Sequence, residues 1–144
     1  MKVPFVNLGK QYYFLRKKIL NKIDSLSLNG DYILGNELDL FEKDFANYCN
    51  TKFAIGVGNG SDAISFSLLA SNIGKGDEVI IPCNSFIATA WTVANVGATP
   101  VFVDVLDDYN IDPKMIIKKI SSKTKAIIPV HLTGKMADMK NILK

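Results

Sequence analysis

The chain has 144 residues, 48% of them hydrophobic, and a formal net charge of +3 at pH 7. This is enough for one domain with a buried core, and so small and dispersed a charge argues against nucleic acid as a partner. No apolar stretch is long enough to span a bilayer, and no signal-peptide core follows the N-terminus. We therefore expect a cytoplasmic protein that does not bind membranes.

Two helical patterns occupy the N-terminal part of the chain. Between residues 11 and 28, apolar residues recur at helical spacing, which predicts a helix that ends at the turn residues 29–31. Asn36 has the residue type of an N-cap, and the apolar positions after it lie on one face of a second helix. We expect residues 1–36 to form a helical arm and connector, and residues 37–144 to form an α/β domain.

Beyond this region, short apolar runs alternate with helical segments. Strands are predicted at residues 53–57, 78–81, 100–104 and 125–130. Helices are predicted to begin at Ser61, Phe86 and Asp112, and a last one after Met136. Such an alternation of strands and helices predicts an α/β fold with a mostly parallel sheet flanked by helices.

Ligands of open α/β sheets bind beyond the carboxyl ends of the strands, and three informative loops fall there. They are residues 58–62, 83–86 and 131–134. The first is glycine-rich and enters a helix, so its backbone N–H groups are suited to bind a phosphate. By itself the same loop is more simply a tight turn with Ser61 as N-cap, because short glycine motifs recur by chance.

The first loop also fits the loose form of a dinucleotide-binding fingerprint, with Gly58, Gly60 and Ala63 at the required spacing. That fingerprint requires an acidic residue at the end of the next strand, where it binds ribose. This strand ends instead in Pro82 and the polar residues after it. The sequence therefore argues against a nicotinamide or flavin dinucleotide.

Two side chains in the other loops are candidate ligand contacts. Phe86 stands at the start of a helix, where its ring could stack on a flat cofactor, although a core position is the commoner role for phenylalanine. His131 is the only histidine; it could orient a ligand or simply cap its loop. One histidine cannot build a metal site, and Cys49 and Cys83 match no metal-binding spacing, so no metal is predicted.

Taken in order, these motifs resemble the DegT/DnrJ/EryC1/StrS family of sugar aminotransferases over almost the whole chain. The similar segments are residues 4–8, 30–35, 57–64, 76–80, 85–90, 97–104 and 129–134. Each block is weak alone, and their order makes the resemblance specific. It implies the N-terminal part of the large domain of a type I aminotransferase fold.

The resemblance also implies a cofactor and its contacts. Family members bind pyridoxal 5′-phosphate at the interface of a homodimer. By this resemblance Ser61 and Asp62, beside Gly60, contact the cofactor phosphate, largely through backbone N–H groups. Phe86 stacks on the pyridine ring, and residues 30–35 lie near the partner subunit's site.

The reaction implied by the resemblance is amino transfer, usually from glutamate, to a nucleotide-linked keto sugar, for polysaccharide or antibiotic biosynthesis. The nucleotide-linked keto sugar and glutamate would thus be the partners of the complete enzyme. His131 is the candidate contact for the sugar substrate.

The chain departs from the family pattern in several ways. Family members are longer, and both their Schiff-base lysine and the aspartate that pairs with the pyridine nitrogen lie further along the chain. Lys135 and Lys140 stand in the wrong motif to replace that lysine, and Thr133 stands where many members have an aromatic residue. We therefore expect an N-terminal fragment that is inactive alone and contains no catalytic residue.

Two alternatives remain open at this point. One is a non-catalytic module that binds a phosphate ligand or a partner with the same sheet. The other is part of a sugar dehydratase of the same fold, in which histidine replaces the lysine.

Overall fold

The computed structural model describes residues 3–144, which form two compact units, one ending at Gly56 and the other beginning at Val57. The domain boundary predicted after residue 36 stays a prediction.

The first unit contains two helices, α1 (Leu8–Asn29) and α2 (Asn36–Tyr48). The helix predicted for residues 11–28 is confirmed, and it begins earlier because the Asn7 side chain accepts the N–H of Lys10 at 3.0 Å. α1 ends at Gly30, whose φ of 69° is the left-handed conformation that glycine adopts without strain.

The N-cap predicted for α2 is wrong by one residue. Gly35 holds the capping position and Asn36 is the first helical residue. A glycine has no side chain with which to cap, and the Asp31 carboxylate accepts the N–H of Asn36 instead, at 3.2 Å. The acceptor for the first turn therefore comes from the preceding turn of the chain.

The strand predicted at residues 53–57 is also wrong, because this segment has no regular secondary structure. Its large side chains are exposed, Phe53 by 77% and Ile55 by 79%. A strand needs a neighbour for its backbone groups, and no strand within residues 3–144 pairs with this segment. The N–H of Gly56 bonds instead to the side chain of Glu42, at 2.6 Å.

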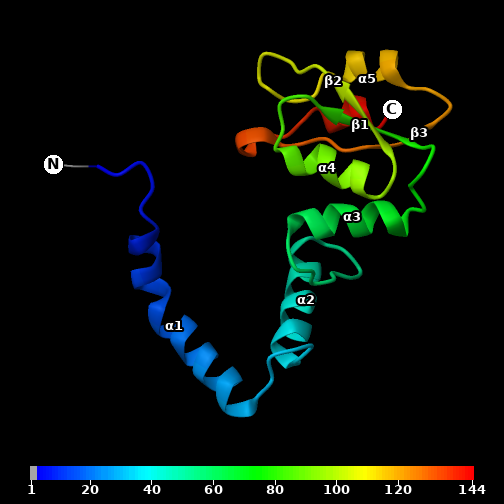
Figure 1. Cartoon of the computed structure of the whole chain (residues 1–144). Helices are drawn as coiled ribbons and strands as arrows, with labels where there is room; N and C mark the ends of the chain where they lie inside the picture. Colours follow the sequence, from blue (N-terminus) through cyan, green and yellow to red (C-terminus); the bar gives the residue numbers. More distant parts are fainter. Residues whose placement is uncertain (1–2) are drawn as a thin grey trace. The chain divides into compact units, whose positions relative to one another are not determined.

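The second unit is built on a three-stranded parallel sheet in the order β2-β1-β3 (Figure 1). The strands are β1 (Glu78–Pro82), β2 (Thr99–Val103) and β3 (Thr124–Ile127). The helices are α3 (Gly60–Ala70), α4 (Ile87–Asn95), α5 (Pro113–Lys119) and α6 (Met139–Ile142). The predicted fold class and three of the four predicted strands are confirmed.

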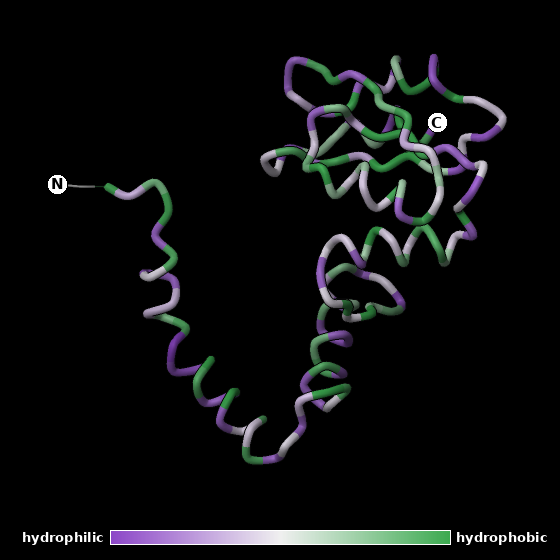
Figure 2. The backbone as a smooth tube through the Cα atoms, viewed as in Figure 1, coloured by the Kyte–Doolittle hydropathy of each residue, from purple (hydrophilic) through white to green (hydrophobic). Residues whose placement is uncertain are grey.

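The central strand β1 is buried on both faces. Val79, Ile80 and Ile81 are all 0% exposed. Because side chains alternate along a strand, Val79 and Ile81 pack with residues of α3 and α4, whereas Ile80 packs with Val103 and with the α5 residue Ile116. Figure 2 shows hydrophobic residues along much of these strands. A continuous apolar run is typical of a parallel strand covered on both faces.

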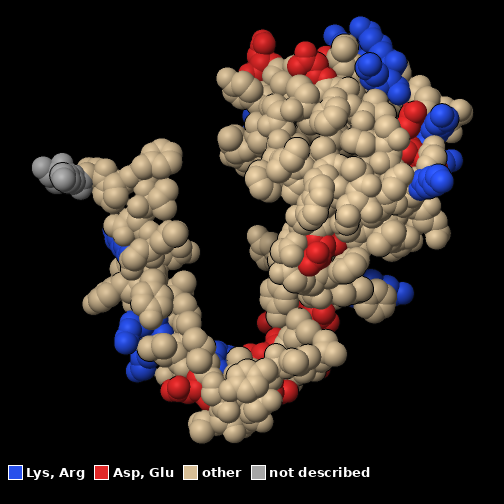
Figure 3. All heavy atoms as spheres, viewed as in Figure 1, with Lys and Arg blue, Asp and Glu red and all other residues tan. Residues whose placement is uncertain are grey.

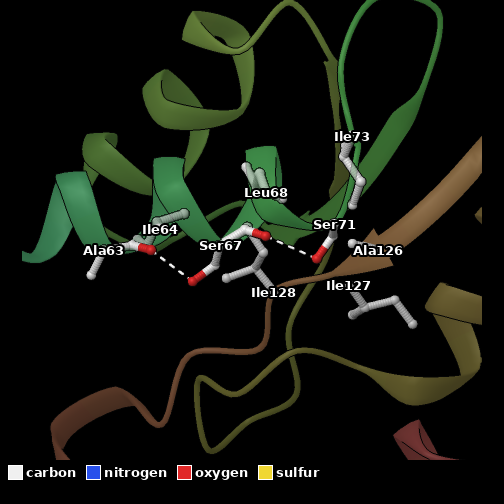
Figure 4. Close-up of a pocket in the computed structure, with 9 residues that line it drawn as sticks. All are labelled: Ala63, Ile64, Ser67, Leu68, Ser71, Ile73, Ala126, Ile127 and Ile128. Carbon is white, nitrogen blue, oxygen red and sulfur yellow. Dashed lines mark hydrogen bonds between the residues drawn. The ribbon is translucent and has the colours of Figure 1, made fainter. Parts of the chain in front are cut away.

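One edge of β3 has no strand partner among residues 3–144 and lies beside an apolar groove. The groove is lined by one side of α3 and by Ala126, Ile127 and Ile128 (Figure 4). The hydroxyl groups of Ser67 and Ser71 donate to carbonyl oxygens of their own helix, at 2.7 and 2.8 Å, so they add no free hydrogen-bond donor to the groove. A second groove lies against the same strand, with Met139, Ile142 and Leu143 among its lining. An unpaired edge of this kind favours association with a further strand.

Charged side chains are distributed over both units. On the face seen in Figure 3, acidic and basic groups occur in small clusters, some of them adjacent to each other, and the view shows no continuous basic surface. No helix formed by residues 3–144 is both long and apolar enough to cross a membrane.

Replacing Ile80 tests the central core. We expect Ile80→Ala to lower the free energy of unfolding by about 2–5 kcal/mol, because it leaves a cavity at a fully buried site. The matched control is Ile117→Ala, at a side chain of α5 that is 71% exposed, with a change within about 0.5 kcal/mol. Urea denaturation followed by circular dichroism measures both, and equal losses would contradict the assigned core.

Candidate functional site

Two of the three predicted ligand loops, residues 83–86 and 131–134, follow β1 and β3 at the carboxyl edge of the sheet. β1 leads through residues 83–86 into α4, and α3 packs on α4. In Figure 1 the first turns of α3 and α4 and the short 3-10 helix η1 (Leu132–Gly134, orange) lie on one side of this unit. The sheet thus brings together loops that are distant in sequence, which is the geometry expected of a ligand site in an α/β fold.

The first loop is organised by Asn59, the N-cap of α3. Its side-chain oxygen accepts the N–H of Asp62 at 2.9 Å, and its side-chain nitrogen donates to the Asp62 carboxylate at 2.9 Å. The sequence had suggested Ser61 for the simple capping role, and this is corrected by the structure. Asn59 caps the helix because its side chain bonds to both the backbone N–H and the carboxylate of Asp62.

This cap leaves the amides of Gly60 and Ser61 available. No hydrogen bond within residues 3–144 uses either N–H group. A side chain added at Gly60 would meet nothing within 4 Å, whereas one at Gly58 would come within 2.7 Å of the Asp62 carboxylate. The free donors, the open space before them and the positive end of the helix dipole fit a phosphate group. The residues present therefore fit the phosphate end of the expected cofactor.

Asp62 differs from the two residues before it. Its N–H is already bonded to Asn59, and its carboxylate accepts from the same side chain. A direct bond from this amide to a phosphate would require Asn59 to turn away. The predicted contact of Asp62 with the cofactor phosphate stays a prediction.

Phe86 is the N-cap residue of α4 and is 78% exposed. The simpler expectation, a phenylalanine in the core, is therefore wrong. α4 is instead anchored by the buried side chains of Thr89, Thr92 and Val93. The ring of Phe86 is available at the carboxyl edge, and its predicted stacking on the pyridine ring stays a prediction.

The loops at this edge are joined by two asparagines that sequence reasoning missed. Asn84 donates from its side chain to the carbonyl of Tyr109 at 3.0 Å, which ties the loop after β1 to the loop after β2. The side-chain oxygen of Asn110 accepts the N–H of Leu132 at 3.3 Å, which ties that loop to the one after β3. The signal that could have identified them is the presence of an asparagine in the loop after each of two successive strands, β1 and β2.

Asn110 is 1% exposed, and its side-chain nitrogen has no hydrogen-bond partner in the part of the chain that the structure describes. Its amide cannot be reversed without losing the bond from Leu132, since only the oxygen accepts. Alongside Lys135, the same side chain adds to the lowering of the pKa of Asp108, so its nitrogen faces that carboxylate beyond hydrogen-bond distance. Asn110 therefore links the loop of Asp108 with the loop of His131.

An ion pair joins the same two loops at the surface. Lys135 Nζ lies 2.8 Å from a carboxylate oxygen of Asp108. The hydrogen bond from Lys135, followed by the backbone N–H of Asn110, lowers the pKa of Asp108 below its ordinary value of 3.8. Lys135 therefore has a structural partner in this loop.

His131 is the N-cap residue of η1 and is exposed. Its ring nitrogen Nδ1 accepts the N–H of Ala137 at 3.1 Å. Two residues later, Thr133 has a φ of 54°, in the left-handed region that β-branched residues avoid. Residues held in such a conformation concentrate at ligand sites and switches. No group of three or more potential metal-binding side chains occurs within residues 3–144.

The chain belongs to the DegT/DnrJ/EryC1/StrS aminotransferase family, whose model matches residues 14–144. It is 46% identical over 99% of its length to a "pleiotropic regulatory protein" of Geobacillus stearothermophilus. It is 45% identical over 97% of its length to dTDP-3-amino-3,6-dideoxy-alpha-D-galactopyranose transaminase of Aneurinibacillus thermoaerophilus. It covers only 38% and 39% of these two proteins.

Solved structures of relatives agree with the fold. DesV of S. venezuelae, solved with a ketimine intermediate, is 42% identical with a TM-score of 0.95, and the match covers 99% of this chain and 38% of DesV. NtdA of Bacillus subtilis, solved with the bound cofactor PMP, is 38% identical with a TM-score of 0.93, over 98% of this chain and 33% of NtdA. PMP is the amine form of pyridoxal phosphate, so the predicted family and its cofactor are confirmed.

Substitution of Asn59 tests the organisation of the first loop. We expect Asn59→Ala to lower the free energy of unfolding by about 1 kcal/mol, because α3 loses its side-chain cap. Asn59→Ser keeps an acceptor for the helix amide and should recover most of that loss. Urea denaturation of the three proteins measures the difference, and a serine variant as unstable as the alanine variant would contradict the capping role.

The Asp108–Lys135 pair predicts a pH dependence. Because the folded pKa of Asp108 is lowered, its contribution to stability is complete above its ordinary pKa of 3.8 and is lost as the pH falls through the lowered folded value. Lys135→Met should raise the folded pKa of Asp108. The pH range between the folded pKa and the ordinary pKa, over which this contribution to stability is lost, should therefore become narrower. The control is Lys140→Met, at an exposed lysine for which no ion pair occurs within residues 3–144. NMR titration of the Asp108 carboxyl measures the shift, and identical curves for the two variants would rule out the pair.

Proposed function

We propose that the complete enzyme is a pyridoxal-phosphate-dependent aminotransferase that transfers an amino group from glutamate to a nucleotide-linked keto sugar. The observation that carries this proposal is the 45% identity to a dTDP-sugar transaminase along nearly the whole chain. The free amides at the start of α3 support it, since they offer the phosphate site that such an enzyme needs.

In this proposal each candidate residue has a defined task. The N–H groups of Gly60 and Ser61, with the Ser61 hydroxyl, bind the cofactor phosphate. Asp62 orients Asn59, and its own contact with the phosphate requires that asparagine to move. Phe86 covers one face of the pyridine ring and keeps water from it. The cofactor, when bound, supplies the electron sink on which amino transfer depends.

His131 is proposed to contact the sugar substrate. Its loop is tied to the neighbouring loop through Asn110 and Lys135, so the ring has a supported position at the carboxyl edge. A ligand held by the start of α3 and a substrate held near η1 would then share one edge of the sheet.

The chain by itself is proposed to be inactive. Lys135 is paired with Asp108 in a loop that does not match the family's lysine motif, and Lys140 lies within the short helix α6. We propose that neither lysine forms the Schiff base that the reaction requires. In this proposal the lysine comes from a part of the enzyme that corresponds to the remainder of its longer relatives, and the cytoplasmic location stays a prediction.

A homodimer is the proposed assembly of the complete enzyme. No residue of α1 is buried, although the helix carries large apolar side chains such as Tyr13, Phe14 and Leu15. On α2, the tilted rings of Phe41 and Phe45 have centroids 5.6 Å apart and remain about half exposed. Surfaces of this kind are typical of protein interfaces, which supports a contact with a second copy.

Ser61 provides the test of the phosphate site. In the complete enzyme, Ser61→Ala should weaken binding of pyridoxal phosphate by about 10- to 100-fold, because one hydrogen bond to a charged group is lost. Ser71→Ala, at the other end of α3, is the control and should leave the dissociation constant unchanged. Equal affinities for all three proteins, measured by cofactor titration, would remove Ser61 from the site.

Absorbance spectroscopy tests the inactivity of the chain alone. With pyridoxal phosphate added, the 144-residue chain should show no visible band of lysine-linked cofactor and no transfer of an amino group from glutamate. The complete enzyme should show both. A stable band from the isolated chain would contradict the assignment of the lysine to another part of the enzyme.

A further inference from the structure

We infer that the loop after β3 presents the Nε2–H of His131 as a fixed hydrogen-bond donor at the carboxyl edge of the sheet, and that Asn110 is the residue that positions it. The choice of a ligand at this edge rests on the proposed function. The state of the histidine ring does not, because it follows from contacts within the chain.

The first step concerns the ring itself. The backbone N–H of Ala137 donates to Nδ1 at 3.1 Å, and a nitrogen that accepts a hydrogen bond cannot also carry a proton. The neutral ring must therefore carry its proton on Nε2. What the exposed ring offers to a ligand through Nε2 is a donor, which recognises an acceptor such as a phosphate, carboxylate or sugar oxygen.

The second step concerns what holds the loop. Its residues are tied at three points: Leu132 to the buried Asn110, Lys135 to Asp108, and Ala137 to His131. Between them the backbone adopts the unfavourable φ of 54° at Thr133. Such a conformation persists only where the surroundings enforce it. The ties through Asn110 and Ala137 are both part-buried and uncharged, so solvent and salt affect them less than the exposed Asp108–Lys135 pair. Of these two, only the tie through Asn110 joins the loop to another loop of the fold.

The third step separates Asn110 from a general core residue. Its side chain contributes an acceptor to Leu132, and its side-chain nitrogen has no partner among residues 3–144. An apolar residue at this position would remove the unpaired donor, but it would also release the N–H of Leu132. The position therefore requires an acceptor, which makes Asn110 a positioning residue for the His131 loop.

NMR of the imidazole nitrogens tests the inference directly, because His131 is the only histidine of the chain. At a pH where the ring is neutral, the ¹⁵N-labelled chain should show Nε2 protonated and Nδ1 bare. The ratio of the Nε2-protonated to the Nδ1-protonated tautomer should be about ten times that of a short histidine peptide. This is the factor that one neutral hydrogen bond supplies. A tautomer ratio equal to that of the peptide would overturn the inference.

Three variants test the role of Asn110. Asn110→Ala should bring the tautomer ratio close to that of the peptide, whereas Asn110→Asp, which keeps an acceptor oxygen, should retain the excess even if it is less stable. Asn95→Ala, at an exposed asparagine of α4, is the matched control and should change nothing. Circular dichroism establishes that each variant is folded. A folded Asn110→Ala variant with the wild-type ratio, or an Asn110→Asp variant with the peptide ratio, would overturn the positioning role.

Two ligand titrations test the donor role and identify its source. Pyridoxal phosphate and thymidine diphosphate are added separately at millimolar concentration, and we expect the Nε2–H signal to move in at least one titration while Nδ1 stays bare. A response to pyridoxal phosphate alone assigns the acceptor to the cofactor, and a response to thymidine diphosphate alone assigns it to the substrate nucleotide. No response to either would overturn the donor role. The proposed phosphate site is followed separately through the Gly60 and Ser61 amides, so the failure of one is distinguishable from the failure of the other.

Discussion

The parallel pairing of β1 with β2 and β3 is the constraint on which the rest of the α/β unit depends. Parallel strands end at a common edge, and each must be followed by a connection that crosses back over the sheet. The loops that carry Phe86 and His131 leave the sheet at the same edge because they follow β1 and β3, which are parallel neighbours. The buried side chains of β1 fix this pairing from both faces, so the core and the candidate site are stabilised by the same strand.

At the candidate site, hydrogen bonds already present in the chain decide which groups remain for a ligand. Asn59 occupies the N–H of Asp62 and leaves those of Gly60 and Ser61 free. In the loop after β3, Ala137 occupies one nitrogen of His131 and leaves the other. The polar groups available to a phosphorylated ligand are thus selected by capping and turn contacts, and do not follow from residue type alone.

Much of the fold could be predicted from the sequence, because the deciding signals are local. The apolar runs of β1 and β2 and the Asp112-Pro113 helix start predict their elements directly. Residues 53–57 carry the same kind of apolar run without forming a strand. A strand also needs a neighbouring strand to pair with, and the sequence of the run itself does not show whether one is present. The exposure of Phe86 and the roles of Asn84 and Asn110 depend on contacts between distant loops, so the pattern of residues along the chain does not reveal them.

The central position of β1 also has a consequence for synthesis on the ribosome. Both neighbours of this strand follow it in the sequence, and β3 ends about 45 residues after β1. At roughly 5–20 residues per second, translation leaves the apolar strand with an incomplete sheet for several seconds. During that interval the backbone and the isoleucine side chains of β1 lack the neighbours that bury them, and exposed apolar surface of this kind is prone to aggregation.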